Sequence, residues 1–326
     1  MSTMTMIEAI RATLHAEMRR DDRVTVLGQD VGQLGGVFRA TADLRDEFGS
    51  SRVVDMPLAE AVIAGSALGL AASGMVPVAE IQFLGFTHQG FHQIASQVAR
   101  YRYRSRGRYP LQLTIRTPFG GGVRTPELHS DALEAQFVQS PGLKVVMPAT
   151  AYDAKGLLAE AIRDPDPVLF CEPLRGYRMV KGEVPDEDYT VGFGRARTAR
   201  QGSDVTIVAW SAAVQMALGA ADELARQGID ATVLDLRTLV PLDVEGLAEA
   251  VAATGRCVVV HEAPLSAGFG AEVVATLQDE CFYDLEAPVA RVTAPDTPYP
   301  LAGIEDQYLP SVQRVVDATI RTVNQV

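Results

Sequence analysis

The sequence predicts an α/β protein made of two doubly wound domains, and three observations carry this prediction. Short apolar runs alternate along the chain with longer segments of helical periodicity. The apolar runs show little polar alternation, which is typical of strands covered on both faces in a parallel sheet. The chain has 326 residues, of which 47% are hydrophobic, so it is long enough for about two cores.

The elements follow in order along the chain. In the first part, the runs predicted as strands are Val24–Gly28, Val76–Phe83, Leu113–Thr117, Lys144–Met147 and Val168–Cys171. In the second part, they are Val205–Trp210, Ala231–Leu236 and Cys257–His261. The helices expected between them are Ala59–Ala72, Asp153–Ile162, Ala213–Gln227 and Asp243–Ala253. We expect Asp153 and Asp243 to be N-caps, and Gly228 to end the third of these helices.

The boundary between the domains is expected between Lys181 and Ser203. Glycine and proline residues interrupt any periodicity there, and the charged run EVPDED lies near the start of the stretch. We therefore divide the chain into a first domain over residues 1–185, a linker over 186–202 and a second domain over 203–326.

Composition excludes several classes of protein. A net charge of −12 argues against nucleic acid as a partner, because phosphate binding needs a basic face. No run reaches the ~18 apolar residues of a membrane-spanning helix, and the N-terminus lacks a signal-peptide pattern, so we expect a cytoplasmic protein with no membrane partner. Cys171, Cys257 and Cys281 form no CxxC pair, and buried inert thiols are expected rather than redox or zinc chemistry.

The common nucleotide and hydrolase motifs are absent from the sequence. No GxGxxG follows a strand, and there is no Walker A, GxSxG or HExxH sequence. Gly120–Gly122 is interpreted as a tight turn, because no phosphate-binding lysine follows it.

Several stretches, in order along nearly the whole chain, resemble the β subunits of 2-oxo acid dehydrogenase complexes. Those of the first part include RVVDMPLAEAVIAGSALGLA from Arg52, PVAEIQF from Pro77 and HSDALEAQF from His129. Those of the second part include DLRTLVPLD from Asp235 and TGRCVVVHEAP from Thr254. The resemblance implies a pyrimidine-binding thiamine-diphosphate domain followed by a transketolase C-terminal-like domain.

The same resemblance implies a heterotetramer of two α and two β subunits that share thiamine diphosphate at their interfaces. In this family the α chain carries the GDG motif that holds Mg²⁺ and the diphosphate, and this sequence contains neither GDG nor an NN pair. We therefore expect the chain to bind the aminopyrimidine end of the cofactor and to leave Mg²⁺ to the α subunit. The other partners implied are a lipoyl acyltransferase core and a small 2-oxo acid.

Glu60, in the sequence PLAE, is the first catalytic candidate. By resemblance, its carboxyl group contacts N1′ of the aminopyrimidine and promotes the tautomer that lets the 4′-imino group deprotonate the thiazolium C2. A glutamate at a helix start in an apolar setting suits proton sharing with a ring nitrogen. The residues alone would also allow an ordinary helix-start acid favoured by the helix dipole.

Two further positions complete the expected site. By resemblance, Phe86 lies against the aminopyrimidine ring, which an aromatic face suits, and Gln82 and Leu58 line the same pocket. His129, in the polar run TPELHSDALEA, is by resemblance the histidine that orients the intermediate and handles protons during acyl transfer to the lipoyl group. Without the resemblance, Phe86 could be a core residue and His129 a solvent-exposed loop residue.

A potassium site is a further implication of the resemblance. In related sequences the segment at Leu111–Thr114 folds against that at Ala161–Asp166 and binds K⁺ mainly through carbonyl oxygens, which suit a large, weakly hydrated cation. The matching positions are Leu111, Leu113, Thr114, Ala161, Asp164 and Asp166. Backbone ligation leaves little trace in side chains, so the sequence leaves the occupancy of this site open.

Two charged patterns are assigned structural roles. Arginines alternate with tyrosines between Arg100 and Tyr109, and we interpret this run as internal ion pairing and subunit contact. His261 and Glu262, at the end of a predicted strand, are expected to serve folding or docking rather than catalysis.

Together these features predict a β subunit that works with an α subunit. The pair would decarboxylate a 2-oxo acid on thiamine diphosphate and reductively acylate the lipoyl group of the acyltransferase core. The sequence leaves pyruvate and branched-chain 2-oxo acids open. The alternatives are an acetoin dehydrogenase β subunit, a single-chain transketolase-type enzyme and a noncatalytic scaffold. The missing diphosphate motif weighs against the single-chain enzyme, and Glu60 with His129 weighs against the scaffold.

Overall fold

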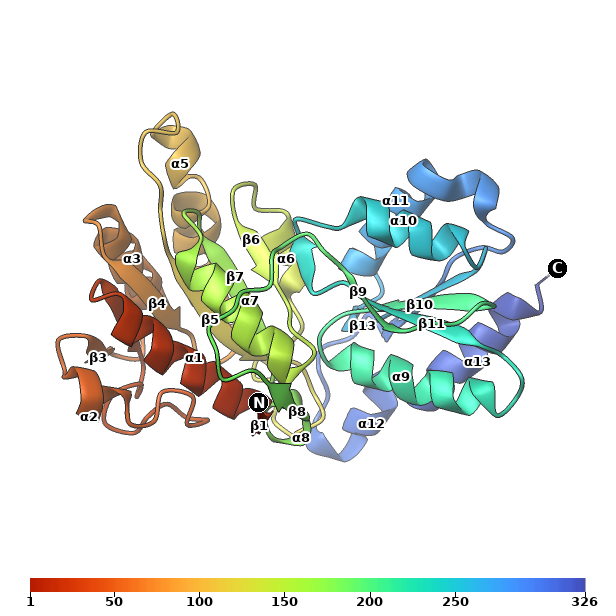
Figure 1. Cartoon of the computed structure of the whole chain (residues 1–326), viewed down its shortest axis with the longest axis horizontal. Coiled ribbons are helices and arrows are strands. Elements are labelled where there is room, and N and C mark those ends of the chain that lie inside the picture. The colour runs from red at the N-terminus through yellow and green to blue at the C-terminus, as the bar shows by residue number, and fades with distance from the viewer. Residues whose placement is uncertain (326) are drawn as a thin grey trace.

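The computed structural model describes residues 1–325, and its first part is organised around one large sheet (Figure 1). Within these residues the strand order is β12, β6, β7, β5, β4, β2 and β3. In that order the strands span Thr238–Val240, Lys144–Val146, Val168–Pro173, Thr114–Phe119, Val76–Glu80, Val24–Gly28 and Val53–Asp55. All pairs are parallel except β12 with β6. The carboxyl ends of the parallel strands therefore meet at one edge of the sheet.

A second sheet organises the other part, in the order β14, β13, β10, β11 and β9. Its strands span Ala290–Ala294, Cys257–Pro264, Val205–Ala209, Ala231–Asp235 and Arg197–Arg200. Only the pairing of β9 is antiparallel within the described residues. A small antiparallel ribbon of β1 (Ser2–Thr5) and β8 (Lys181–Val184) joins the N-terminus to the segment that leaves the first sheet.

Helices cover both faces of each sheet. The principal ones are α1 (Met6–Arg20), α3 (Glu60–Ala72), α7 (Ala151–Arg163), α9 (Ala212–Ala225), α10 (Val244–Ala252), α11 (Phe269–Cys281) and α13 (Val312–Val323). The short elements are α2 (Leu44–Phe48), η1 (Leu84–Phe86), α4 (Thr87–Phe91), the π-helix η2 (His92–Val98), α5 (Tyr101–Arg104), α6 (Glu134–Val138), α8 (Gly176–Met179), η3 (Phe282–Asp284), η4 (Ala302–Ile304) and α12 (Glu305–Tyr308). No helix among residues 1–325 is long and apolar enough to cross a membrane.

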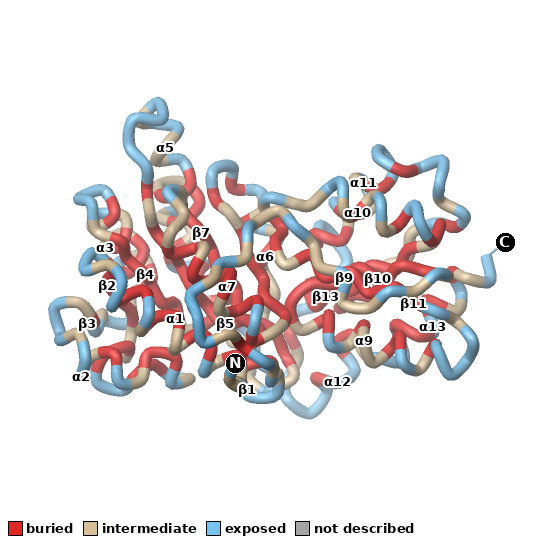
Figure 2. Tube along the Cα trace, viewed as in Figure 1, coloured by how far each residue is buried: buried red, intermediate tan, exposed pale blue. Residues whose placement is uncertain are grey.

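The strands are buried on both sides, as Figure 2 shows. Alternate strand residues face opposite layers, so Val24 and Val26 pack with α1 and α7, whereas Leu27 packs with α3. The cluster on the α3 side continues into the second part, where it includes Trp210 and Phe269. The two parts therefore share one apolar core across their boundary.

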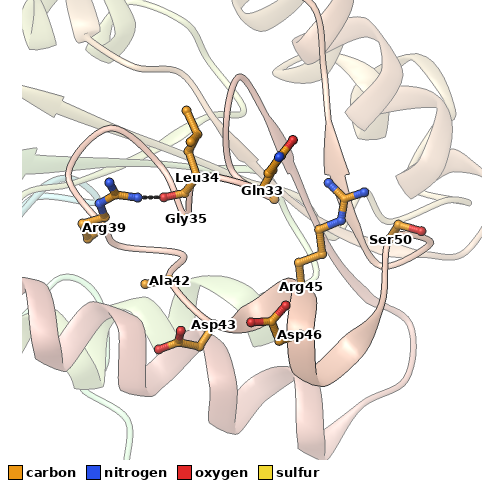
Figure 3. Close-up of a pocket in the computed structure, with 10 residues that line it drawn as sticks. Gln33, Leu34, Gly35, Arg39, Ala42, Asp43, Arg45, Asp46 and Ser50 are labelled. Carbon is orange, nitrogen blue, oxygen red and sulfur yellow. Dashed lines mark hydrogen bonds between the residues drawn. The ribbon is translucent and has the colours of Figure 1, made fainter.

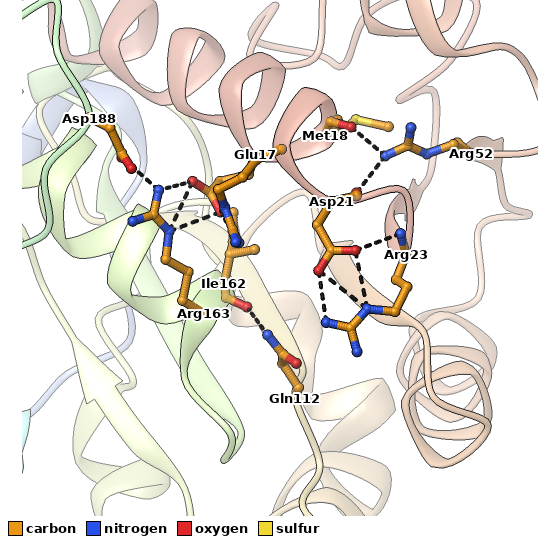
Figure 4. Close-up of polar contacts among 10 residues, drawn as sticks. Glu17, Met18, Asp21, Arg23, Arg52, Gln112, Ile162, Arg163 and Asp188 are labelled. Carbon is orange, nitrogen blue, oxygen red and sulfur yellow. Dashed lines mark hydrogen bonds and ion pairs between the residues drawn. The ribbon is translucent and has the colours of Figure 1, made fainter.

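Local signals fix the main helices. A capping box of Thr5 and Glu8 begins α1. The ends of α1 and α7 are then joined by Glu17, which is 1% exposed and accepts from Arg163 Nη2 at 2.5 Å (Figure 4). Arg163 also contacts Asp188 at 2.6 Å, which attaches the segment after β8 to the same point.

Most of the elements predicted from the sequence are confirmed within a few residues, and Asp243 is confirmed as an N-cap, accepting from the Gly246 N–H at 3.1 Å. Asp153 as the N-cap of α7 was wrong. Thr150 caps this helix, and Asp153 is fully buried in an ion pair with Arg237 at 2.7 Å. A distant arginine engages the carboxylate, and local sequence gives no sign of such a partner.

The expected linker over 186–202 also contains structure. Strand β9 lies inside it and pairs with β11. Strand β12, from the second part of the chain, extends the first sheet. The second part of the chain thus contributes one strand to the sheet of the first part.

Candidate active site

Glu60 is the first residue of α3, and its side chain lies in a largely buried position. It is 7% exposed, and its carboxylate forms no hydrogen bond or ion pair with another of residues 1–325. The preceding N-cap, Ala59, has no side-chain acceptor to offer the helix. Helix α4 packs on this turn, because a Cβ on Gly90 would lie 3.2 Å from the Glu60 carbonyl oxygen. A nearly buried carboxyl group without a protein partner is costly, so its position suits binding of an external group.

The segment after β4 brings Phe86 and His129 together, although 43 positions separate them in sequence. The His129 ring meets the rings of Phe83 and Phe86 edge-on, with centroids 4.6 and 4.9 Å apart. Phe83 and Phe86 also contact each other, at 5.3 Å. Phe86 is the N-cap of α4, the helix that packs on the first turn of α3. The structure therefore brings three sequence-predicted residues, Glu60, Phe86 and His129, to neighbouring elements.

A close backbone contact holds this arrangement. A Cβ on Gly85 would lie 2.1 Å from the Leu128 carbonyl oxygen, so only glycine lets the His129 loop approach the turn at Phe86. Leu128 itself has a left-handed backbone, with φ of 64°. The His129 Nδ1 lies 3.2 Å from the carbonyl of Glu127.

The two remaining cofactor candidates differ. Gln82 is partly buried, and its amide nitrogen Nε2 has no hydrogen-bond partner among the described residues. An orphaned buried donor of this kind suits a polar ligand. Leu58 is 73% exposed, so it lies on the surface of this chain rather than in a closed pocket.

Behind the aromatic rings lies a buried ionic cluster that sequence reasoning missed. Arg116, on β5, binds Glu172 through two bonds of 2.8 and 2.6 Å and also contacts Glu80. Tyr177 donates its hydroxyl to Glu172. Burial raises the pKa of Glu80, although Arg116 opposes the shift. The pairings of β4, β5 and β7 create this cluster, and its one available signal was charged residues within otherwise apolar strands.

A row of contacting aromatic rings connects this ionic cluster to the candidate site. The Phe38 ring lies 5.5 Å from that of Tyr177 and 5.5 Å from that of Phe83. Phe83 in turn contacts Phe86 and His129. The ionic cluster is therefore linked to the candidate site by a continuous row of side-chain contacts.

The segments expected to hold potassium do lie together. The Leu111 N–H donates to the Pro165 carbonyl at 3.0 Å, and the Gln112 side chain donates to the Ile162 carbonyl at 2.8 Å (Figure 4). The Thr114 hydroxyl is buried without a partner among residues 1–325. The charged positions are already paired within the chain. Asp164 contacts Lys144 at 2.6 Å, and Asp166 contacts Arg102 at 2.8 Å.

A separate pocket of about 780 Å³ lies outside this site, between the loop after β2 and α2 (Figure 3). Its wall includes Gln33, Arg39 and Asp46, and Arg39 donates to the Leu34 carbonyl. None of the predicted site residues lines it. Its open, polar shape differs from that of a small-molecule site, which is mostly enclosed and apolar.

Comparisons with known proteins agree with this geometry. The pyrimidine binding domain model of transketolases matches residues 2–179, and the transketolase C-terminal domain model matches residues 194–315. The pyruvate dehydrogenase E1 component subunit beta of Bacillus subtilis is 51% identical over 97% of this chain and 98% of its own length. That of Staphylococcus epidermidis is 50% identical over 99% of both chains. The chain belongs to the family of pyruvate dehydrogenase E1 β subunits.

The chain shares its fold with transketolases. A solved split-gene transketolase, described as an inactive β4 tetramer, superposes with a TM-score of 0.81 at 25% identity over 99% of both chains. A transketolase mutant from Pichia stipitis gives a TM-score of 0.71 at 15% identity, and this chain matches 46% of its length. The second likeness concerns the fold alone. The expected fold and the expected family of thiamine-diphosphate-dependent β subunits are thus confirmed.

Proposed function

We propose that this chain is the β subunit of a pyruvate dehydrogenase that forms a heterotetramer of two α and two β subunits in the cytoplasm. The observation that carries the proposal is the identity of about half of all residues with pyruvate dehydrogenase β subunits over nearly the full length of the chain. The same similarity favours pyruvate over branched-chain 2-oxo acids and acetoin.

Thiamine diphosphate, when bound, would supply the electron sink for loss of carbon dioxide from the 2-oxo acid. On this chain, the Glu60 carboxyl would exchange a proton with N1′ of the aminopyrimidine. Phe86 would present its ring to the aminopyrimidine, and the free Nε2 of Gln82 would donate to it. The low exposure of Glu60 supports its role, because water would otherwise compete for the proton.

His129 would then act at the acyl-transfer stage. Its ring packs at a steep angle against two phenylalanine rings, so the surroundings orient it without supplying a competing carboxylate. We propose that it hydrogen-bonds the reacting oxygen and passes a proton while the acyl group moves to the lipoyl arm. Mg²⁺ and the diphosphate would be held by the α subunit. K⁺ would bind at the carbonyls of Leu111 and Leu113 and neighbouring positions.

The test is co-expression of the chain with the pyruvate dehydrogenase α subunit of the same organism. Reduction of ferricyanide is measured with pyruvate, a branched-chain 2-oxo acid and acetoin as substrates, the first two being decarboxylated and acetoin being cleaved between its carbonyl and carbinol carbons. Pyruvate is expected to give the highest kcat/KM. Tight binding of thiamine diphosphate by the isolated chain would contradict the division of the site between two subunits.

Glu60→Gln tests the chemistry. Removal of a general acid–base group is expected to lower kcat by about a hundredfold or more, with unchanged assembly of the pair. Glu245→Gln is the matched control, because Glu245 also lies in the first turn of a helix but is exposed. A Glu60→Gln pair as active as the control would refute the proposed role of Glu60.

A further inference from the structure

The loop that carries His129 is attached to the second domain at its beginning. Gly120–Gly122 leaves β5 and meets two buried carboxylates from that domain. The Gly121 N–H donates to Glu262, on β13, at 3.2 Å. The Gly122 and Arg124 N–H groups both donate to Glu305, the first residue of α12, at 3.1 Å.

The end of the same loop is attached to the second domain as well. Glu134 begins α6 and is 1% exposed. Its carboxyl oxygen lies 3.4 Å from the indole nitrogen of Trp210, the residue after β10. Trp210 is itself fixed by stacking on His261, with ring centroids 5.1 Å apart, and by an edge contact with Phe269. His129 thus lies between two attachment points, and both belong to the other domain.

At the first attachment, the backbone of the consecutive glycines lies very close to side chains of the second domain. A Cβ on Gly121 would lie 2.1 Å from the Tyr299 hydroxyl, and one on Gly120 would lie 2.4 Å from Glu262 Oε2. Tyr299 donates its hydroxyl to Glu305 at 2.6 Å. The consecutive glycines are therefore required by the carboxylates and the tyrosine around them. No phosphate-binding function is needed to explain them.

The imidazole of His129 has few contacts of its own that could fix its position independently of the loop. Among residues 1–325 the imidazole contacts the carbonyl of Glu127 and two phenylalanine rings in edge-to-face geometry, and no side chain hydrogen-bonds it. Edge contacts permit small displacements of a ring. The backbone path of the loop therefore decides where the imidazole lies.

We propose that Glu262 and Glu305 of the second domain are positioning residues that fix the His129 loop for acyl transfer. The inference rests on the acyl-transfer role proposed above for His129. It gives the second domain a part in the reaction, whereas the sequence suggested only folding or docking for Glu262.

The electrostatics around Glu262 provide a distinctive signature. Burial raises the pKa of Glu262 to about 7; the nearby Glu134 and Glu305 carboxylates reinforce the shift, and the Gly121 N–H and Arg175 oppose it. Tyr299, Tyr308, Asp306 and Arg124 are further titratable or charged groups beside this attachment. An ionised carboxylate accepts a backbone N–H more strongly than a neutral carboxyl does. The hydrogen bond from the Gly121 N–H to Glu262 is therefore expected to strengthen between pH 6 and pH 8.

The experiment uses the co-expressed heterotetramer and two assays at pH 6 and pH 8. One assay follows ferricyanide-coupled decarboxylation of pyruvate, and the other follows acetylation of an isolated lipoyl domain. For Glu262→Gln, acetylation is expected near the wild-type rate at pH 6 and about fivefold slower at pH 8, because an amide oxygen resembles the neutral carboxyl. At pH 8, Glu262→Gln is expected to lower the rate of acetylation by a larger factor than the rate of decarboxylation. A merely structural defect would lower both assays together and at both pH values.

Hydrogen exchange of the peptides covering residues 120–134 gives a readout independent of activity. Exchange is expected to speed up about tenfold or more in Glu305→Gln and to a smaller extent in Tyr299→Phe, which removes only one hydroxyl and is the milder probe of folding. Glu286→Gln is the control, because Glu286 is a second-domain carboxylate that pairs with Arg256 instead. Wild-type exchange and wild-type acetylation in both Glu262→Gln and Glu305→Gln would overturn the proposal.

His129→Ala separates this inference from the proposed function. If His129→Ala leaves acetylation unchanged, the role proposed for His129 fails, and with it the link of the attachment to acyl transfer. The exchange data then still decide whether the two carboxylates hold the loop. If His129→Ala slows acetylation but the carboxylate variants do not, the positioning role alone is refuted.

Discussion

Arg116→Met is the perturbation that most directly tests how the first domain is held together. Arg116 is 1% exposed, and the side chains of its partners Glu80 and Glu172 are 6% and 0% exposed. Methionine fills a similar volume but leaves two buried carboxylates beside each other without a cation. Loss of one partner from a buried ion pair costs about 3–5 kcal/mol, and we expect a value in this range at pH 8.

The pH dependence of this cost follows from the same residues. Without Arg116, which opposes the effect of burial, the native pKa of Glu80 rises further above the unfolded value of about 4.3. A group with a raised native pKa binds a proton more tightly in the folded state, so its destabilising effect grows as the pH rises. The deficit of Arg116→Met should therefore be larger at pH 8 than at pH 6.

Scanning calorimetry of the co-expressed heterotetramer, at one protein concentration, measures the effect. A domain of this size loses about 2–4 °C in Tm per kcal/mol, so a fall of about 10 °C is expected at pH 8. Arg256→Met is the control, since Arg256 pairs with Glu286, which is 58% exposed, and such pairs contribute less than about 1 kcal/mol. Equal effects of the two substitutions, or a smaller deficit at pH 8 than at pH 6, would refute the reasoning.

Three further outcomes are expected. Gly85→Ala should lower acetylation of the lipoyl domain about tenfold or more, because its methyl group would push Leu128 and the loop behind it, whereas Gly192→Ala, with open space around it, should not. Glu262→Gln should gain stability relative to wild type as the pH rises from about 4.5 to about 7, levelling off at about 3 kcal/mol, because the raised native pKa makes ionised Glu262 destabilising; an equal Tm of the variant and the wild type at pH 8 would contradict this. Burial raises the thiol pKa of Cys171 and Cys257, so neither should react with a thiol reagent at pH 7 until the protein unfolds.

Much of the fold was predictable because its signals are local. The buried strands at Val24–Gly28 and Val205–Ala209 follow from continuous apolar runs, and the cap at Asp243 follows from a single residue type. The short strands β9 and β12 were not predicted. Both are short, β9 also carries little apolar character, and they exist because neighbouring strands offer them a pairing edge.

The site shows the same division. The sequence determined which residues could do chemistry: Glu60 at a helix start, an aromatic at Phe86 and a histidine in a polar loop. It also determined the family. Only the tertiary structure decided that Phe86 and His129 touch, and that Gly85 permits this contact. Only the tertiary structure gave Glu262 and Glu305 a place at the other end of that loop. The physical reason is that residue types and periodicity act over a few positions, whereas burial, pairing of charges and backbone contact depend on segments that meet only when the chain has folded.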